Sequence, residues 1–263
     1  MSSRGRHPLF VGFYHCARTV ERASSLLFHA AAGAARLADL RAAIQREWDY
    51  QAADSDSYIA SGLMPWERAF YLAFLKPDDR ILLIGCGTGR DLLALRELGY
   101  RAEGLDVGPW CTARARAVLK ARHLDTPVYT GAIETTDVPG TFDVFIFSWF
   151  CYSYIPHSET RTAVLRKLRG QLASGGRILV TYEPVRTPSR RLPIRLARLV
   201  GRLSGSDWRP EYGDVVRLGD PGRYFEHFEH RFTPDGLEEE AQVAGLTVAF
   251  HEGGEAGRAV LTT

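Results

Sequence analysis

Cysteine is scarce in this chain, and its four residues show none of the spacings that bind metals or form redox pairs. No two of them form a C-x-x-C pair, which excludes zinc and thioredoxin-type motifs built on that pair. We therefore expect reduced thiols and a cytoplasmic protein. Cys86 falls within a run of glycines, where we expect it to pack rather than to act as a nucleophile.

Long apolar runs and a strong net charge are also missing. No apolar stretch is long enough to span a bilayer, and the one near the N-terminus is interrupted by His15, Arg18 and Glu21, too early for a secretory signal. The formal net charge is only +2, so we expect no nucleic-acid partner for the molecule as a whole. A chain of 263 residues could form one α/β domain with additions or two small domains, and one domain is favoured. The hydrophobic fraction of 45% is that of an ordinary soluble protein and indicates neither disorder nor a membrane class.

Residues 80–91, RILLIGCGTGRD, combine a short apolar run with a glycine-rich turn. The apolar residues 81–84 are typical of a strand that is buried on both faces. Three glycines at alternate positions then let the backbone bend sharply and approach a ligand closely. A dinucleotide-binding fingerprint would need its third glycine where Arg90 stands. The stretch predicts a strand, a loop and a helix, with a ligand at the bend.

With its G-x-G-x-G spacing, this stretch resembles the first motif of the class I methyltransferases that use S-adenosylmethionine (SAM). Asp106 follows the glycines by about 20 residues, at the end of a second predicted strand, where the family places an acid on the cofactor ribose. A carboxylate there can accept hydrogen bonds from both ribose hydroxyls. The resemblance continues through residues 131–134, 142–147 and 172–180, and covers about residues 66–263.

The resemblance implies a doubly wound α/β fold with a seven-stranded, mostly parallel sheet and SAM as the cofactor. It divides the chain into an N-terminal helical cap, residues 1–65, and a SAM-binding domain, residues 66–263. Within that domain, residues 183–223 are a basic insertion after the fifth strand, which we expect on the substrate side. The predicted cofactor contacts are Gly85, Cys86, Gly87, Gly89, Asp91, Asp106, Ala132, Ile133, Ser148 and Trp149.

One position departs from the family pattern. Many members carry an acid two residues before the first glycine that helps to hold the cofactor, whereas this chain has Leu83. Asp91 and Glu134 are the acids available to replace it. The departure leaves open an alternative function, a SAM-binding regulatory protein without turnover. An aminopropyl transferase is a weaker alternative, because the chain has no paired acidic motif to hold a polyamine.

Aromatic residues gather in residues 149–154, after the predicted fourth strand. Ligands bind at the carboxyl ends of strands in open α/β sheets, so Tyr152 and Tyr154 are candidates to orient the methyl acceptor or to contact the methylsulfonium through a cation–π interaction. Packing is the alternative role.

Histidine is preferred as the general base because its unperturbed pKa lies at about 6.5. The candidate bases are Glu183, Asp214, His227 and His230. The two histidines lie in the segment E-H-F-E-H, residues 226–230. This segment lacks the H-E-x-x-H spacing of a zinc-binding helix, so we expect no metal site.

Two further segments have the pattern of amphipathic helices. Leu37, Leu40, Ile44 and Trp48 form one apolar stripe, and family members lay such N-terminal helices over the cofactor, so we expect either a lid, with Tyr50 or Tyr58 in contact, or plain packing. Residues 190–204 place arginines beside an apolar face. That segment predicts contact with an anionic membrane or lipid-linked substrate, recognition of a substrate phosphate or carboxylate, or a solvated surface.

These observations predict an enzyme that transfers the methyl group of SAM to an oxygen, nitrogen or carbon of a small molecule. Positioning of the two reactants supplies most of the acceleration in such a transfer, and a base need remove only one proton. No feature of the sequence indicates the acceptor or the oligomeric state.

Overall fold

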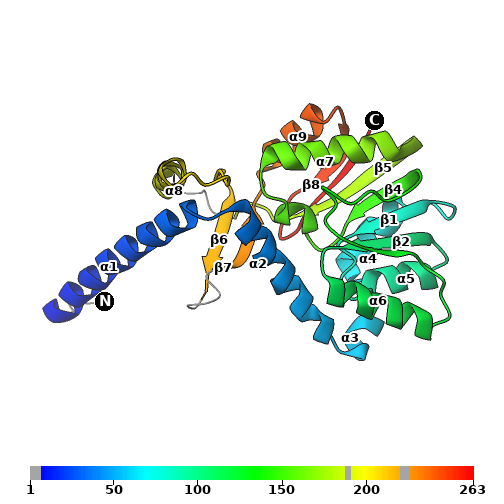
Figure 1. Ribbon diagram of the computed structural model, residues 1–263, viewed down its shortest axis with the longest axis horizontal. Coiled ribbons are helices and arrows are strands. Elements are labelled where there is room, and N and C mark those ends of the chain that lie inside the picture. The colour runs from blue at the N-terminus through cyan, green and yellow to red at the C-terminus, as the bar shows by residue number, and fades with distance from the viewer. Residues whose placement is uncertain (1–6, 187–190, 220–224) are drawn as a thin grey trace, which may run out of the picture.

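A sheet with helices on both faces forms the body of the protein, and a long N-terminal helix projects from it (Figure 1). The computed structural model describes residues 7–186, 191–219 and 225–263. Within these residues, no helix has both the length and the apolar character of a membrane span.

The sheet has seven strands in the order β3-β2-β1-β4-β5-β9-β8. The strands β1 to β5 are parallel, while β9 pairs antiparallel with both β5 and β8. Their bounds are β1 Arg80–Ile84, β2 Arg101–Asp106, β3 Val128–Thr130, β4 Phe142–Phe147, β5 Leu172–Tyr182, β8 Thr247–Glu252 and β9 Gly257–Thr262. The predicted doubly wound, mostly parallel sheet is confirmed.

Each face of the sheet has its own apolar core, because alternate residues of a strand point to opposite faces. Leu82 and Ile84 face the helices α7 (Ser158–Gln171) and α9 (Pro234–Val243), whereas Ile81 and Leu83 face α4 (Pro65–Phe74), α5 (Arg90–Glu97) and α6 (Pro109–Ala121). Leu83, which stands where the family has an acid, is fully buried in the second of these cores. A carboxylate would be costly there without a partner.

The N-terminal region is helical, with α1 Pro8–Gly33, α2 Leu37–Asp49, η1 Tyr50–Ala53 and α3 Asp56–Ala60. Leu40 and Ile44 of α2 pack with Trp208 and Phe228 in a third apolar cluster. This packing lays α2 against β7 (Phe225–His230) and brings η1 and α3 toward α5 and α6. The predicted helix over Leu37 to Trp48 is therefore confirmed.

The insertion after β5 contributes α8 (Arg191–Ser204) and β6 (Asp214–Leu218), and β6 pairs antiparallel with β7 in a separate two-stranded sheet. Residues 187–190 and 220–223 of the predicted insertion lie outside the described residues. The prediction of a single apolar face on α8 is wrong. Ile194 is buried, and Gly33 of α1 meets Ala197 of α8 closely, whereas Leu192, Leu199 and Leu203 of α8 are exposed.

Side chains at two helix starts make specific hydrogen bonds. Thr233 caps α9 by accepting from the backbone N–H of Gly236, with Pro234 in the first turn. His157 is the N-cap residue of α7, and the hydroxyl of Ser158 donates to Glu211. Helix α7 ends at Gln171, and β5 begins at Leu172.

Candidate active site

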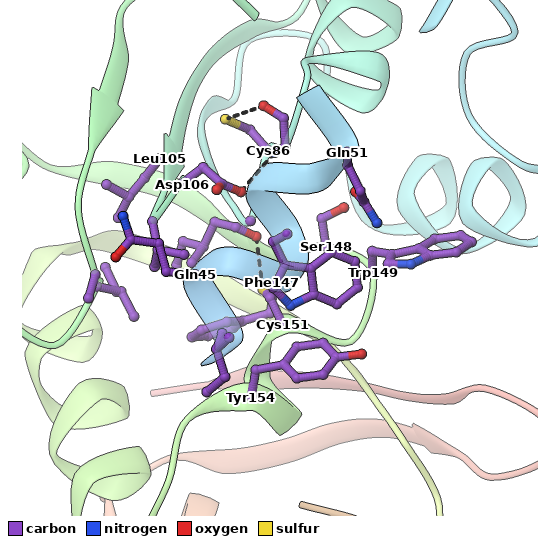
Figure 2. A pocket seen from close by; sticks show the side chains of 18 of the residues that line it. Gln45, Gln51, Cys86, Leu105, Asp106, Phe147, Ser148, Trp149, Cys151 and Tyr154 are labelled. Carbon is purple, nitrogen blue, oxygen red and sulfur yellow. Dashed lines mark hydrogen bonds between the residues drawn. The ribbon is translucent and has the colours of Figure 1, made fainter. Parts of the chain in front are cut away.

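A cavity of about 380 Å³ lies at the carboxyl ends of β1, β2 and β4 (Figure 2). Its volume is within the range of roughly 300–1,000 Å³ found for small-molecule sites. Helix α2 crosses in front of it, and the side chains that Figure 2 labels come from α2, η1, β2, β4, the loops after β1 and β4, and the short 3-10 helix η2 (Cys151–Tyr154). Among the predicted cofactor residues, those on the wall are Gly85, Cys86, Gly87, Asp91, Asp106, Ala132, Ile133, Ser148 and Trp149.

The glycine turn is shaped by the contacts of its first and last glycines. Gly85 has a φ of +79°, and a Cβ there would lie 2.8 Å from the Cβ and Sγ of Cys151. Gly89 has a φ of +93° at the N-cap of α5 and packs on Ala115. It is not on the cavity wall, so the structure assigns it to the packing of α5 on α6 rather than to the predicted cofactor contact.

Asp106 is held at the end of β2 by two backbone groups. Its Oδ2 accepts from the N–H of Gly87 and its Oδ1 from the N–H of Gly108, each at 2.8 Å. Burial raises the pKa of this carboxyl group, and the two backbone donors oppose that rise. Because a carboxylate has about four acceptor positions, the side chain can still accept from two hydroxyl groups of a ligand.

A buried ion network lies at the other end of the glycine turn. Arg90 donates from Nε to Asp91 Oδ1 at 2.7 Å and from Nη2 to both oxygens of Glu67 at 2.6 and 2.7 Å. Asp91 Oδ2 also accepts from the hydroxyl of Ser148 at 2.7 Å. Burial and the nearby Asp91 raise the pKa of Glu67 to about 7. A pKa of about 7 leaves Glu67 partly protonated at neutral pH, so the excess of negative charge over the single guanidinium is partial, and a cationic ligand would increase it.

Asp91 and Glu134, the acids available in place of the one missing at Leu83, lie at different parts of the cavity wall. Asp91 is on the wall beside Ser148, at the end of β4. Glu134 is also on the wall, but next to Ala132 and Ile133, and its nearest cation is Arg41 at 3.9 Å. Asp91 is therefore the better placed of the two acids to act near the glycine turn.

The loop after β4 contains two consecutive aromatic residues with positive φ, Trp149 at +45° and Phe150 at +61°. Left-handed backbone costs of order 1–3 kcal/mol in a residue with a side chain. Stacking of Phe150 on Trp66, with rings 5.8 Å apart, and a hydrogen bond from the Phe150 N–H to the Thr181 hydroxyl at 2.9 Å hold this turn. It leaves Trp149 on the cavity wall, with the Arg90 guanidinium 5.1 Å from its ring.

The two predicted tyrosines point in different directions from η2 (Cys151–Tyr154). Tyr154 lies on the cavity wall (Figure 2). Tyr152 is fully buried between Phe147 and Phe232, and its hydroxyl donates to Glu240 at 2.7 Å. Tyr152 is therefore part of the core, and its prediction as a catalytic contact is not supported by its position.

None of the four candidate bases is on the cavity wall. His227 lies behind Tyr154, with Nδ1 2.8 Å from Glu47 and Nε2 3.2 Å from Glu229. Burial alone would lower the pKa of His227, but the two carboxylates outweigh it and raise the pKa to about 9. The ring is then a cation at neutral pH and cannot accept a proton.

His230 is engaged on the other side of β7. Its Nδ1 lies 2.7 Å from Asp214 Oδ1 and its ring packs on Phe232. Glu211 completes a group whose ligand-type atoms lie within 4.8 Å of one another, but Glu211 already accepts from Ser158 and Arg161. These contacts tie the insertion to α7.

Sequence reasoning missed most of the wall that the N-terminal region provides. Tyr58, a predicted lid contact, is on the wall, whereas Tyr50 is 84% exposed and is not. Ile44 and Trp48, from the stripe expected to form a lid, are also on the wall, and the residues that sequence reasoning missed are Arg41, Gln45, Gln51 and Asp54. Together, Arg41, Ile44, Gln45 and Trp48 follow the i, i+3, i+4, i+7 spacing of one helix face. The spacing was visible in the sequence, but the same stripe also serves packing.

Comparison with known proteins agrees with this geometry. The profile of a family described as "Methyltransferase domain" matches residues 57–249. The chain belongs to this methyltransferase family. It is an α/β enzyme of the SAM-dependent class, and SAM is its cofactor.

Individual relatives are more distant. The chain is 29% identical over 107 residues to the ribosomal protein L11 methyltransferase of Thermus thermophilus, which covers 41% of this chain and 39% of that protein. The chain thus spans about two fifths of that relative. A SAM-dependent methyltransferase from Methanosarcina mazei has a TM-score of 0.57 at 18% identity, over 76% of this chain and 97% of its own. A SAM-dependent methyltransferase from Bacteroides fragilis, in complex with S-adenosyl-L-homocysteine, has a TM-score of 0.51 at 17% identity, over 76% of this chain and 82% of its own. These structures share the fold.

Proposed function

We propose that this methyltransferase acts on an oxygen, nitrogen or carbon of a small molecule that enters the cavity beside Trp149 and Tyr154. The observation that carries the proposal is the cavity itself. It is bounded by the sheet on one side and by α2, η1 and α3 on the other, which leaves room for a compact ligand rather than for a protein surface. The division into a cap, residues 1–65, and a catalytic domain, residues 66–263, is part of this proposal.

Different residues of the cavity wall suit different parts of the cofactor. Asp106 would accept from the ribose hydroxyls, and Ala132 and Ile133 would frame the adenine. Asp91, with Arg90 and Glu67 behind it, would face the positively charged methionine end. When bound there, SAM supplies the electrophilic methyl group.

The acceptor end of the cavity is aromatic and contains one polar group without a partner among the described residues. The Nε1 of Trp48 is buried and has no hydrogen-bond partner among the described residues, although Trp48 is on the wall with its ring 4.9 Å from that of Tyr154. Buried donors without a partner are rare and costly. A polar atom of the acceptor would satisfy this donor and fix the orientation of the nucleophile.

Catalysis in this proposal depends on position more than on a base. None of the described residues on the wall is a histidine, and the cationic His227 lies against the edge of Tyr154. Holding two reactants in line can account for a large part of a rate enhancement. Such a site suits an acceptor that is deprotonated, or nearly so, before it binds.

Trp48→Phe tests the acceptor end, because it removes the N–H and keeps an aromatic ring. A panel of phenols, amines and carboxylates is screened first for formation of S-adenosylhomocysteine. With any acceptor found, we expect about tenfold higher KM for that acceptor in the variant and unchanged affinity for SAM. Equal KM values in the two proteins would remove Trp48 from acceptor binding.

The apolar Leu83 left open a SAM-binding regulatory protein without turnover, but membership of the methyltransferase family favours the enzyme. Turnover on a single small molecule would exclude the regulatory alternative. Tight SAM binding with no S-adenosylhomocysteine formed on any acceptor class would contradict the enzyme.

We also propose that α8 contacts an anionic lipid surface. Leu192, Leu199 and Leu203 are 66%, 52% and 80% exposed and lie on one side of the helix beside an arginine row formed by Arg191, Arg195, Arg198 and Arg202. Exposed leucines beside arginines are typical of helices that lie in a membrane interface. Such a contact would suit a lipid-linked acceptor.

Vesicle sedimentation at low salt tests this contact. We expect the protein to sediment with phosphatidylserine vesicles and not with phosphatidylcholine vesicles. Leu203→Glu should abolish sedimentation, while Val243→Glu, at a 59% exposed valine of α9, should leave it unchanged. Absence of wild-type binding to either vesicle would contradict the proposal.

A further inference from the structure

Helix α1 carries large apolar side chains that the rest of the described chain leaves exposed. Leu9, Phe13, Val20 and Leu27 are 66%, 75%, 66% and 71% exposed. Figure 1 shows that α1 extends away from the body and that only its C-terminal end lies next to α8. An exposed apolar stripe of this length is typical of an interaction site.

The stripe has the spacing of a coiled-coil seam. Its residues follow one another at intervals of four, three, four, three and four, which is the heptad pattern of paired helices. They are Leu9, Phe13, Cys16, Val20, Ala23 and Leu27. We call these six residues the α1 seam.

The charges of α1 lie away from this seam. Arg18, Glu21 and Arg22 occupy positions outside the rows that flank it. The flanking rows, which would lie closest to a partner helix, carry no charged side chain and consist of Phe10, Gly12, Ala17, Thr19, Ser24 and Leu26. Two identical helices could therefore pair without like charges meeting.

The sizes of the seam residues favour one orientation. In an antiparallel pair centred on Arg18, Phe13 faces Ala23, Val20 faces Cys16 and Leu9 faces Leu27 of the other helix. Each layer then has a similar volume, as close packing requires. A parallel pair in register would instead place two phenylalanines in one layer and two alanines in another.

We propose that the α1 seam binds the α1 seam of a second copy of this chain, antiparallel, across a two-fold axis. Phe10 and Phe13, with about 150–250 Å² of surface each, are 57% and 75% exposed. With the aliphatic seam residues of both copies, the buried area is on the order of 1,000 Å², which a specific interface needs. The same patch on both subunits gives a closed dimer.

The mass of the full chain in solution tests the proposal, by light scattering and by sedimentation equilibrium. We expect twice the chain mass of 29.3 kDa for the wild type. Val20→Glu, which places a charge near the centre of the seam, should give a monomer, with dimerisation weakened at least about tenfold. Val11→Glu is the matched control, because Val11 lies on the opposite side of the same helix. It should remain a dimer.

Helix content by circular dichroism and SAM affinity are measured in both variants to show that they fold, and Phe13→Gln provides a second seam variant. A monomeric wild type at every micromolar concentration would overturn the proposal. So would equal effects of Val20→Glu and Val11→Glu on the mass. Wild-type monomers that bind phosphatidylserine vesicles and lose that binding with Val20→Glu would identify a lipid surface as the occupant instead.

Discussion

Tyr152 and Tyr154 lie two positions apart in η2 but differ in role. Tyr152→Phe removes a buried hydroxyl that donates to Glu240, so we expect the free energy of unfolding to fall by about 1 kcal/mol with no change in acceptor KM. Tyr154→Phe changes a residue of the cavity wall and should raise acceptor KM with little effect on stability. Urea unfolding measures the stability of the two variants, and steady-state kinetics measures their acceptor KM. A change of KM in Tyr152→Phe and a loss of stability in Tyr154→Phe would contradict the assigned roles.

His227 should make the protein less stable at alkaline pH. Its pKa is raised from 6.5 to about 9 by the carboxylates of Glu229 and Glu47, which outweigh burial. A raised pKa in the folded state gives stability that is complete below pH 6.5 and is lost as the pH rises through about 9. We expect a loss of roughly 2–3 kcal/mol over this window.

Urea unfolding at several pH values measures this loss. In His227→Gln the decrease between pH 6.5 and about 9 should be much smaller than in the wild type. If the two proteins lost the same free energy of unfolding, another group would be responsible.

Residue spacing in the sequence was enough to find Asp106 and the glycine turn, because backbone geometry at the end of a strand depends on few residues. It was not enough for the candidate bases. Histidine is the residue type preferred for a base, but two carboxylates from separate elements, Glu47 of α2 and Glu229 of β7, hold His227 as a cation. Contacts between elements far apart in sequence decide such roles.

At the scale of elements, the turn between β1 and α5 should be the least tolerant part of the fold. Gly85→Ala adds a Cβ both at a φ of +79° and against Cys151, whereas Gly99→Ala has a similar φ of +94° and open space around it. We expect about 1–2 kcal/mol of destabilisation for Gly99→Ala and a larger one, with loss of SAM binding, for Gly85→Ala. Thermal unfolding and SAM titration of both variants make the comparison, and equal effects would show that contact with Cys151 is unimportant.

The elements around the glycine turn could be predicted because each has a strong local pattern, such as the apolar run of β1 and the apolar stripe of α2. The insertion could not. The sequence shows that α8 is amphipathic, but two of its sides carry apolar residues, and only the packing of Gly33 on Ala197 decides which side is buried.

At the scale of the whole molecule, cofactor binding should couple to stability, because the cavity joins the cap helices to the sheet. A ligand at about one hundred times its Kd adds about 2.7 kcal/mol to the free energy of unfolding. We expect SAM to raise the melting temperature of the entire chain in a single transition. Separate melting of residues 1–65 would contradict this. The cytoplasmic location expected from the cysteines stays a prediction.

Calorimetric titration of SAM and of S-adenosylhomocysteine into the wild type and into Asp106→Ala tests the central claim, that this cavity holds the cofactor with Asp106 on its ribose. Asp137→Ala is the control, since the side chain of Asp137 is 95% exposed. We predict binding by the wild type and the control, and affinity at least about tenfold weaker, a loss of 1.4 kcal/mol or more, in Asp106→Ala. No binding by the wild type, or equal binding by all three proteins, would contradict the claim.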